Sequence, residues 1–335
     1  MNRASNIAVV GATGLVGKTF LELLESDHFV DSKIDLVASS KSKGKEVLFR
    51  NSVHVVNSLE EFDFSDVDVV FFSAGAEAAK EYAPKAEKAG CFVVDNSSCF
   101  RKDENIPLIV PEVNGETLTV DSTPGIVANP NCQTIQMVVA LKPLHDLFVI
   151  NRIDVTTFQA VSGSGKLAQD ELVTQIGQVL KGETPSLNIY NKQIAFNALP
   201  HCGDFEENSY TQGEMKMVWE THRILDPNIE VGATCVRVPI ANGHSESVHV
   251  ETRELINIDT VIECLSEAEG INLIQGKDSE SYVTAAEVNG TDLVHVGRLR
   301  MDLWSSNRLN LWVVADNLRK GAALNSIQIA EILFS

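Results

Sequence analysis

The chain has 335 residues and a formal net charge of −19, and 44% of its residues are hydrophobic. This length exceeds what one hydrophobic core usually serves, so two domains are expected. The negative charge argues against nucleic acid as a partner, because a nucleic-acid binder needs a basic face. The chain also lacks an apolar run of about twenty residues, so we expect no membrane span.

The six cysteines are scattered, at positions 91, 99, 132, 202, 235 and 264. A long chain with unpaired cysteine spacing is typical of a reducing compartment, and the first residues run directly into a predicted strand without a signal sequence. We therefore expect a cytoplasmic protein. The adjacent His201 and Cys202 have no second pair of ligands nearby, so no metal site is predicted.

A glycine-rich turn follows the first predicted strand, residues 7–10. Its glycines are Gly11, Gly14 and Gly17, and a helical pattern of apolar residues comes next. The spacing is one residue wider than the usual dinucleotide fingerprint, but such a turn still brings backbone N–H groups to a phosphate at a helix N-terminus. Strand, turn and helix in this order favour nucleotide binding over a plain tight turn.

The second predicted strand, residues 34–38, ends in a polar segment with three lysines and three hydroxyl side chains. In NAD-binding proteins an Asp or Glu commonly ends this strand and holds the ribose hydroxyls. Lysines and hydroxyls can instead bind a 2′-phosphate, so NADP is favoured over NAD. The alternatives are an exposed polar turn, or an NAD site that uses Asp35.

Further strands are predicted at residues 67–72, 91–94, 106–110 and 125–128. The run at 67–72 is continuously apolar, which is typical of a strand covered on both faces. Helical segments alternate with the strands, and small or polar residues follow each strand. This pattern predicts an α/β, Rossmann-like domain with a parallel sheet and a site along the carboxyl edge of that sheet.

Beyond about residue 140 the predicted strands alternate apolar and polar residues, at 150–161, 233–240, 247–255 and 309–314. This pattern predicts an α+β domain with a mixed, largely antiparallel sheet. Residues 162–230 are expected to hold one helix, at 168–180, followed by irregular chain.

The last predicted helix, residues 323–334, is expected to pack back on the nucleotide domain. We therefore assign residues 1–128 and 317–335 to that domain, and residues 129–316 to the second domain.

The segment Asn129-Pro130-Asn131-Cys132 precedes an apolar run with helical spacing. An Asn that can cap a helix and a Pro that fits an early helical position predict a buried helix that starts here. At a helix N-terminus, unpaired N–H groups and the helix dipole favour the thiolate of Cys132, which is the form that attacks a carbonyl carbon. Alternatively, Cys132 is a small apolar residue at the start of a core helix.

Five further residues stand in polar, small-residue contexts: Arg101, Gln159, Lys216, Arg237 and His244. Each has an ordinary structural explanation, from a surface charge to a loop histidine with satisfied hydrogen bonds. A cysteine at a helix start, a histidine that can move a proton and arginines that bind anions nevertheless form a chemically sensible set. Together with a dinucleotide domain, this set favours covalent acyl chemistry coupled to hydride transfer.

Eight motifs follow one another between residues 7 and 324: GATGLVG, DNSSCFR, VPEVN, NPNCQT, FQAVSGSG, IAFNALPH, RVPIANGHSESV and ADNLRKGAA. In this combination the chain resembles the bacterial aspartate-β-semialdehyde dehydrogenase family. The resemblance implies a homodimer whose second domain serves catalysis and dimerisation, while the first binds NADP. It also implies reduction of L-aspartyl-4-phosphate by NADPH to L-aspartate 4-semialdehyde, with release of phosphate, on the route to lysine, methionine and threonine.

The resemblance assigns catalytic roles residue by residue. Cys132 would attack the acyl phosphate and hold an acyl-thioester, and His244 would act as general acid/base. Gln159 would orient the acyl group. Arg237 would pair with the α-carboxylate of the substrate, which suits its bidentate fork.

The resemblance also assigns anion and cofactor contacts. Arg101 and Lys216 would hold the phosphate that leaves. NADP would contact Gly11, Ala12, Thr13, Gly14, Leu15, Val16, Lys41, Ser42, Ser162, Gly163 and Asn317.

Two positions depart from the family's pattern. The family's amine-binding glutamate lies three residues before the lysine, and that position here is Gly213, with Glu214 one step nearer. Either Glu214 takes over this role or the ammonium of the substrate is held less tightly. Lys41 stands where the family usually has an arginine, which keeps the charge but loses the planar fork.

Three alternatives compete with this assignment. A reductase of N-acetylglutamyl phosphate would share the fold and chemistry, but its cysteine motif typically reads N-P-G-C, whereas Asn131 precedes Cys132 here. A non-catalytic paralogue should have lost the nucleophile. A nucleotide-sensing module would need only the first domain and has no use for the Cys, His and Arg set.

Overall fold

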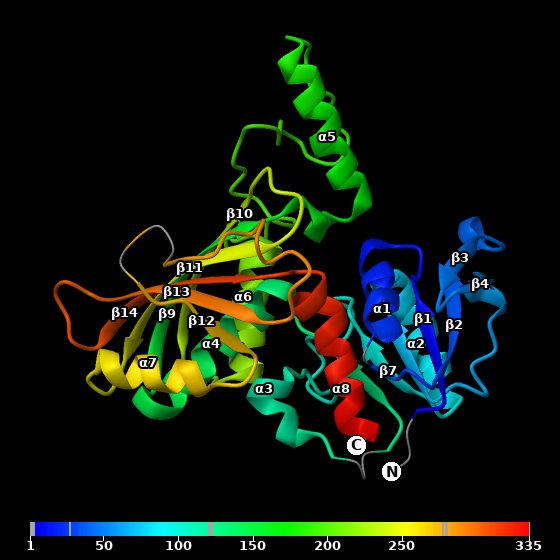
Figure 1. The fold of residues 1–335 in the computed structure, drawn as a ribbon, viewed down its shortest axis with the longest axis horizontal. Coiled ribbons are helices and arrows are strands. Elements are labelled where there is room, and N and C mark those ends of the chain that lie inside the picture. The colour runs from blue at the N-terminus through cyan, green and yellow to red at the C-terminus, as the bar shows by residue number, and fades with distance from the viewer. Residues whose placement is uncertain (1–3, 27, 120–122, 277, 279–280, 335) are drawn as a thin grey trace. The chain divides into compact units, whose positions relative to one another are not determined.

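The computed structural model describes residues 4–26, 28–119, 123–276, 278 and 281–334. The chain forms two compact units, which are coloured along the chain in Figure 1. The first comprises Met1–Asn131 and Ala322–Ser335, and the second comprises Cys132–Gly321. No helix among the described residues is both long enough and apolar enough to cross a membrane.

The first unit is built on a parallel six-stranded sheet in the order β5-β2-β1-β6-β7-β8. Its strands are β1 (Asn6–Val10), β2 (Lys33–Ala38), β5 (Asn57–Ser58), β6 (Val69–Phe72), β7 (Phe92–Asp95) and β8 (Ile126–Ala128). Every residue of β6 is buried, as its continuous apolar run predicts. A separate antiparallel hairpin joins β3 (Glu46–Phe49) and β4 (Ser52–Val55).

Helices cover both faces of this sheet: α1 (Leu15–Ser26), α2 (Ala76–Lys88), α3 (Pro111–Asn114) and α8 (Leu324–Phe334), with the short helices η1 (Ser40–Ser42), η2 (Leu59–Glu61) and η3 (Gly115–Thr117). Alternate residues of β1 enter different cores. Ile7 packs in the cluster that includes α1 and α8, whereas Ala8 packs in the cluster that includes α2. The expected return of the last helix to this unit is confirmed, because Ile327 and Leu333 lie in the first of these cores.

The second unit contains a mixed six-stranded sheet in the order β10-β9-β11-β14-β13-β12. The central pairs are antiparallel, and the pair at each edge is parallel. Its strands are β9 (Ile150–Gln159), β10 (Glu230–Arg237), β11 (His244–Thr252), β12 (Ile271–Leu273), β13 (Val294–Met301) and β14 (Arg308–Ala315). The predicted combination of a parallel Rossmann-like sheet and a second, mixed sheet is therefore confirmed.

Helices α4 (Cys132–Phe148), α6 (Gln212–Ile224) and α7 (Ile258–Glu267) pack together on one face of this sheet, as Figure 1 shows. Helix α5 (Lys166–Leu180) follows the short helix η4 (Val161–Ser164) and packs in a small separate core. A single π turn, η5 (Arg319–Ala323), precedes α8. The opposite face of the sheet therefore receives none of the three helices that cover the first.

Two expectations about secondary structure were wrong. Residues 106–110 form no strand, since only Leu108 makes an isolated bridge, to Ala128. Pro107 has no N–H to donate, and Pro111 begins α3, so the segment is too restricted to extend the pairing. The supposedly irregular chain before residue 230 contains helix α6, whose first turn is closed by a capping box between Thr211 and Glu214.

Candidate active site

Three of the predicted side chains lie at one end of the second unit's sheet. β9 and β10 run parallel, and their last residues, Gln159 and Arg237, are paired in register. β11 runs antiparallel to β9 and begins at His244, so it starts where β9 ends. Gln159, Arg237 and His244 are all buried, with His244 completely inaccessible.

Cys132 is the first residue of α4, and this helix packs against β9, β11 and β14. Only Val149 separates the end of α4 from the start of β9, so the helix runs back along the strand. The first turns of α4 therefore lie at the end of the sheet that holds Gln159 and His244. The Gln136 side chain, one turn after Cys132, accordingly donates a hydrogen bond to the His244 backbone oxygen at 3.3 Å.

The helix start differs in detail from the expectation, because Asn129 and Pro130 precede α4 instead of capping and opening it. The Asn129 side chain donates to Asn96 Oδ1 at 2.9 Å and so fixes the loop that ends in the first unit. The Cys132 Sγ donates to Gln133 Oε1 at 3.3 Å. The first N–H groups of α4 have no helical carbonyl partners, and they favour a negative charge at this position.

The hydrogen bonds of His244 determine which nitrogen of the neutral ring carries the proton. The backbone N–H of Ala160 donates to His244 Nδ1 at 3.0 Å, so the proton of the neutral ring is on Nε2. Nε2 is buried and has no hydrogen-bond partner among the described residues. Burial, followed by the positive charge of Arg237, lowers the pKa of His244 to about 3.

Arg237 and His244 converge on a space that a glycine leaves open. Arg237 Nη1 donates to the Ala160 carbonyl oxygen at 2.7 Å. A Cβ atom at Gly163 would lie 3.0 Å from Arg237 Nη1 and 3.2 Å from His244 Nε2. A side chain at Gly163 would therefore displace both groups or occupy the space that they face.

The chain that follows β14 connects this space with Cys132. Asn317 accepts a hydrogen bond from the Gly243 N–H at 2.8 Å and donates one to Ser162 Oγ at 3.0 Å. Gly321 lies against Cys132, since a Cβ at Gly321 would be 2.9 Å from the Cys132 Cβ. Ser162 and Asn317 are both predicted to contact the cofactor. They thus also hold the loop that leads into β11 at His244.

Glu214 and Lys216 lie on helix α6 and not in the irregular loop that we expected. The Met217 Sδ lies 3.9 Å from the hydroxyl of Thr134, which is in the first turn of α4. Lys216, adjacent to Met217 and half-buried, is therefore on the helix that packs against the first turn of α4.

The Glu214 carboxylate binds backbone N–H groups with both of its oxygens. Oε2 accepts from Thr211 at 2.7 Å, and Oε1 accepts from Cys235 at 3.0 Å. Cys235 lies on the edge strand β10, whose outward N–H groups need partners. Glu214 therefore links the start of α6 to β10.

We expect Glu214→Ala to lower the stability of the protein by about 1–3 kcal/mol, because it removes a helix cap and leaves two buried N–H groups unpaired. The melting temperature checks this expectation, with Glu287→Ala as the control, since Glu287 caps Thr284 at an exposed position. An unchanged melting temperature together with a raised substrate KM would instead support the amine-binding role.

The first unit holds the predicted dinucleotide turn. Gly11 has a φ of +89°, and a Cβ there would lie 2.3 Å from the Ser73 oxygen. A Cβ at Gly17 would lie 2.1 Å from the Gly11 oxygen, so only glycine lets α1 pack this closely on the turn. The N-terminus of α1 is thereby presented at the carboxyl end of β1, where a phosphate can accept its N–H groups.

The polar segment after β2 lies beside this turn. Ser42 is buried in η1, and its Oγ is 3.4 Å from the Thr13 Oγ1. Lys45 Nζ also donates to Ser42 at 3.2 Å, while the neighbouring Lys41 is exposed. Positive charge therefore accompanies the glycine turn on the side of β2.

Arg101 belongs to the first unit, in the turn after β7. Its Nη2 donates to the Asn96 backbone oxygen at 2.8 Å. The buried Asp95, which ends β7, accepts from the N–H and hydroxyl of Ser97 in the same turn. The first unit holds Arg101 with the glycine turn, Lys41 and Ser42, and the remaining predicted site residues belong to the second unit: Cys132, Gln159, Ser162, Gly163, Glu214, Lys216, Arg237, His244 and Asn317.

The low pKa of His244 predicts a specific loss of stability in acid. Below the ordinary pKa of 6.5 the unfolded chain binds a proton that the folded protein does not bind until about pH 3. This difference lowers the free energy of unfolding by about 1.4 kcal/mol per pH unit as the pH falls below 6.5. In His244→Asn the side chain can still accept from Ala160 but does not titrate. We therefore expect its free energy of unfolding to fall by about 2 kcal/mol less than that of wild type between pH 7 and pH 5.

Melting temperatures at the two pH values measure this effect. His249→Asn, on the same strand, is the matched control. Equal acid sensitivity of wild type and His244→Asn would contradict a neutral, buried His244.

Comparisons with known proteins agree with this arrangement. Residues 6–120 match the family model of the semialdehyde dehydrogenase NAD binding domain, and residues 141–320 match that of the semialdehyde dehydrogenase dimerisation domain. An aspartate-semialdehyde dehydrogenase from Legionella pneumophila is 52% identical, covering 99% of this chain and 96% of that protein.

Solved structures give the same result. Aspartate semialdehyde dehydrogenase II from Vibrio cholerae, complexed with ASA, superposes with a TM-score of 0.95 at 48% identity, covering 99% of this chain and 98% of that one. The enzyme from Candida albicans, with NADP, superposes with a TM-score of 0.77 at 26% identity, covering 99% of this chain and 98% of that one. The chain belongs to the aspartate-semialdehyde dehydrogenase family.

Proposed function

We propose that the protein reduces L-aspartyl-4-phosphate to L-aspartate 4-semialdehyde with NADPH and releases phosphate. The observation that carries this proposal is the convergence of Gln159, Arg237 and His244 at the end of the sheet where α4 begins with Cys132. A nucleophile, an anion-binding fork and a hydrogen-bond donor in one place suit acyl transfer. The relatives named above support the choice of substrate.

Cys132 supplies the covalent step. Its thiolate attacks the acyl carbon, a C–S bond forms, and the bond from that carbon to the phosphate oxygen breaks. NADPH, when bound, supplies a hydride to the acyl carbon. The C–S bond then breaks, and the electron pair returns to Cys132 as the aldehyde leaves.

His244 acts at the acyl oxygen. Since Nδ1 accepts from Ala160, the ring presents its Nε2–H, which can donate to the negative charge that develops on this oxygen. Gln159 assists in orienting the acyl group, and its amide is held by the Thr157 hydroxyl at 3.0 Å. His244 is thus the proposed general acid/base of the site, and its Nε2–H holds the oxygen of the tetrahedral adduct by a hydrogen bond.

The cationic side chains recognise the two ends of the substrate. Arg237 is already bound to the Ala160 oxygen through Nη1, so its remaining N–H groups are oriented for the α-carboxylate. Lys216 and Arg101 receive the phosphate. Glu214 remains a candidate for the ammonium only as a third partner, beside its two backbone N–H groups.

Residues 1–128 and 317–335 form the proposed NADP-binding domain, and residues 129–316 the catalytic and dimerisation domain. Gly11 and Gly17 let α1 start close against the turn after β1, and the N–H groups at this helix start fit a pyrophosphate. Lys41 and Ser42 would receive the 2′-phosphate of NADP. The nicotinamide end of NADP would contact Ser162, Gly163 and Asn317.

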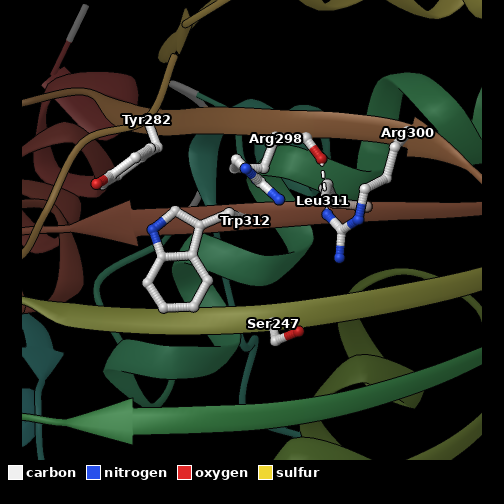
Figure 2. A pocket seen from close by; sticks show the side chains of 6 residues that line it. All are labelled: Ser247, Tyr282, Arg298, Arg300, Leu311 and Trp312. Carbon is white, nitrogen blue, oxygen red and sulfur yellow. Dashed lines mark hydrogen bonds between the residues drawn. The ribbon is translucent and has the colours of Figure 1, made fainter. Parts of the chain in front are cut away.

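We further propose that the protein is a homodimer that uses the face of the second sheet opposite α4. This face contains a cavity of about 330 Å³, and Figure 2 shows Trp312, Tyr282 and Arg298 lining it. Leu303 and Trp304, between β13 and β14, are 88% and 91% exposed, and such apolar surface is typical of an interface. Sedimentation velocity tests the dimer. We also propose a cytoplasmic location, with which six cysteines that form no disulfide are in keeping.

The deciding experiment is phosphate-dependent reduction of NADP by the purified protein. L-Aspartate semialdehyde is compared with N-acetylglutamate semialdehyde, and NADP with NAD. Turnover of the first aldehyde with NADP is the expected result. Turnover of the N-acetyl compound alone would overturn the substrate, and no turnover from protein that binds NADPH would point to a non-catalytic paralogue.

A further inference from the structure

A carboxyl group with no evident role lies beneath the candidate active site. Glu246 is completely buried, and neither carboxyl oxygen has a hydrogen-bond partner among the described residues. It lies on β11 two residues after His244, so both side chains are on the same face of the sheet. Its neighbours across the sheet are Thr157 and Val313, and neither carries a charge.

Gln136 brings a second incomplete polar group to the same place. It is completely buried on α4, one turn after Cys132. Its Nε2 donates to the His244 backbone oxygen, while its Oε1 is buried without a partner in the described part of the chain. The amide therefore has one end satisfied and one acceptor unused.

The physical chemistry of the two groups is complementary. A carboxylate at Glu246 would be a buried charge without a counterion, so the neutral acid is favoured. Burial accordingly raises the pKa of Glu246 well above its ordinary value, and the Gln136 side chain is the group that opposes this shift. A neutral carboxylic acid has one O–H to donate, and Gln136 Oε1 needs one donor.

We propose that Glu246 is a positioning residue, whose neutral carboxyl donates to Gln136 Oε1 and so fixes the amide that holds the His244 backbone. This chain of contacts joins the helical turn that follows Cys132 to His244, the first residue of β11. It sets the distance between the nucleophile and the hydrogen-bond donor of the reaction. The inference rests on the proposed function and adds two residues that touch neither substrate nor cofactor.

The test separates positioning from simple packing. Methionine has nearly the volume of glutamate, and replacing a buried, unpaired polar group by an apolar one is usually neutral or stabilising. We therefore expect Glu246→Met to keep or raise the melting temperature. We also expect its kcat to fall about 10- to 100-fold, with a much smaller change in KM, because the reacting groups are displaced.

Two more variants define the interaction. Glu246→Gln keeps a donor for Gln136 and should retain kcat within about three-fold. Gln136→Met should lose as much kcat as Glu246→Met, and the double variant should lose no more than either single one, since both break the same contact. Gln136→Met also tests the proposal if Glu246→Met fails to fold.

Glu171→Met is the matched control. Glu171 is a buried carboxylate on α5 that accepts from the N–H groups of Asn188, Ile189 and Tyr190. Its replacement should lower the melting temperature and leave kcat per folded molecule unchanged. The same behaviour in Glu246→Met, or wild-type kcat in both Glu246→Met and Gln136→Met, would overturn the proposal.

A spectroscopic readout separates this proposal from the proposed function. Absence of turnover in wild type would contradict the proposed function. The ¹⁵N resonances of the His244 ring would then still test whether Glu246 positions His244. They are assigned by their loss in His244→Asn. They should shift in Glu246→Met and not in Glu246→Gln, and identical resonances in all three proteins would overturn the proposal.

Discussion

Cys132→Ala is expected to lower kcat by about 10⁴-fold or more, because no other group can form the acyl-enzyme. The dissociation constant for NADPH should stay unchanged, since the glycine turn belongs to the first unit and Cys132 begins the second. Steady-state turnover and a fluorescence titration with NADPH measure the two quantities.

Cys264→Ala provides the control for this experiment. Cys264 is a free, half-buried thiol on α7, whereas Cys132 begins α4. Wild-type activity is expected in the control. Substantial turnover by Cys132→Ala would remove the covalent mechanism.

Arg237→Lys is expected to raise the KM for L-aspartate semialdehyde about 100-fold, although the charge is retained. Arg237 uses Nη1 to bind the Ala160 oxygen at 2.7 Å, so the guanidinium can serve the backbone and a carboxylate at once. A lysine ammonium is a point charge and lacks the planar fork of the guanidinium. Initial rates over a range of substrate concentrations give KM and kcat separately.

Arg253→Lys is the corresponding control, since Arg253 is exposed just beyond the end of β11. Its KM should equal that of wild type. An unchanged KM in Arg237→Lys with a lowered melting temperature would show that Arg237 is a structural residue.

Local patterns were sufficient to predict most of the fold. The apolar runs at β1 and β6 and the glycine turn between β1 and α1 depend on residues close together in sequence, and they predicted the parallel sheet. The failures have local causes as well. Residues 106–110 are mostly apolar, but they contain Pro107 and are followed by Pro111. Helix α6 carries Gly213 in its first turn, which obscured the capping box around it.

The site was predictable only as a set of residue types. Cys132 and His244 could be named because a loop or turn marks each of them. Glu246 could not, because its burial depends on the packing of α4 against β11, in which Gln136 contacts His244 from 108 positions earlier in the sequence. The tautomer of His244 likewise depends on a hydrogen bond from Ala160, 84 positions earlier in the sequence.

The return of α8 to the first unit has a consequence for the synthesis of the protein. The sheet of that unit is complete at Ala128, but its core still lacks the apolar side chains of Leu324–Phe334. A ribosome must translate the whole second unit before it supplies them, so the dinucleotide domain finishes folding only after the second unit has been synthesised. Removing Leu324–Phe334 would therefore leave first units with an open apolar face, exposed to proteases and chaperones.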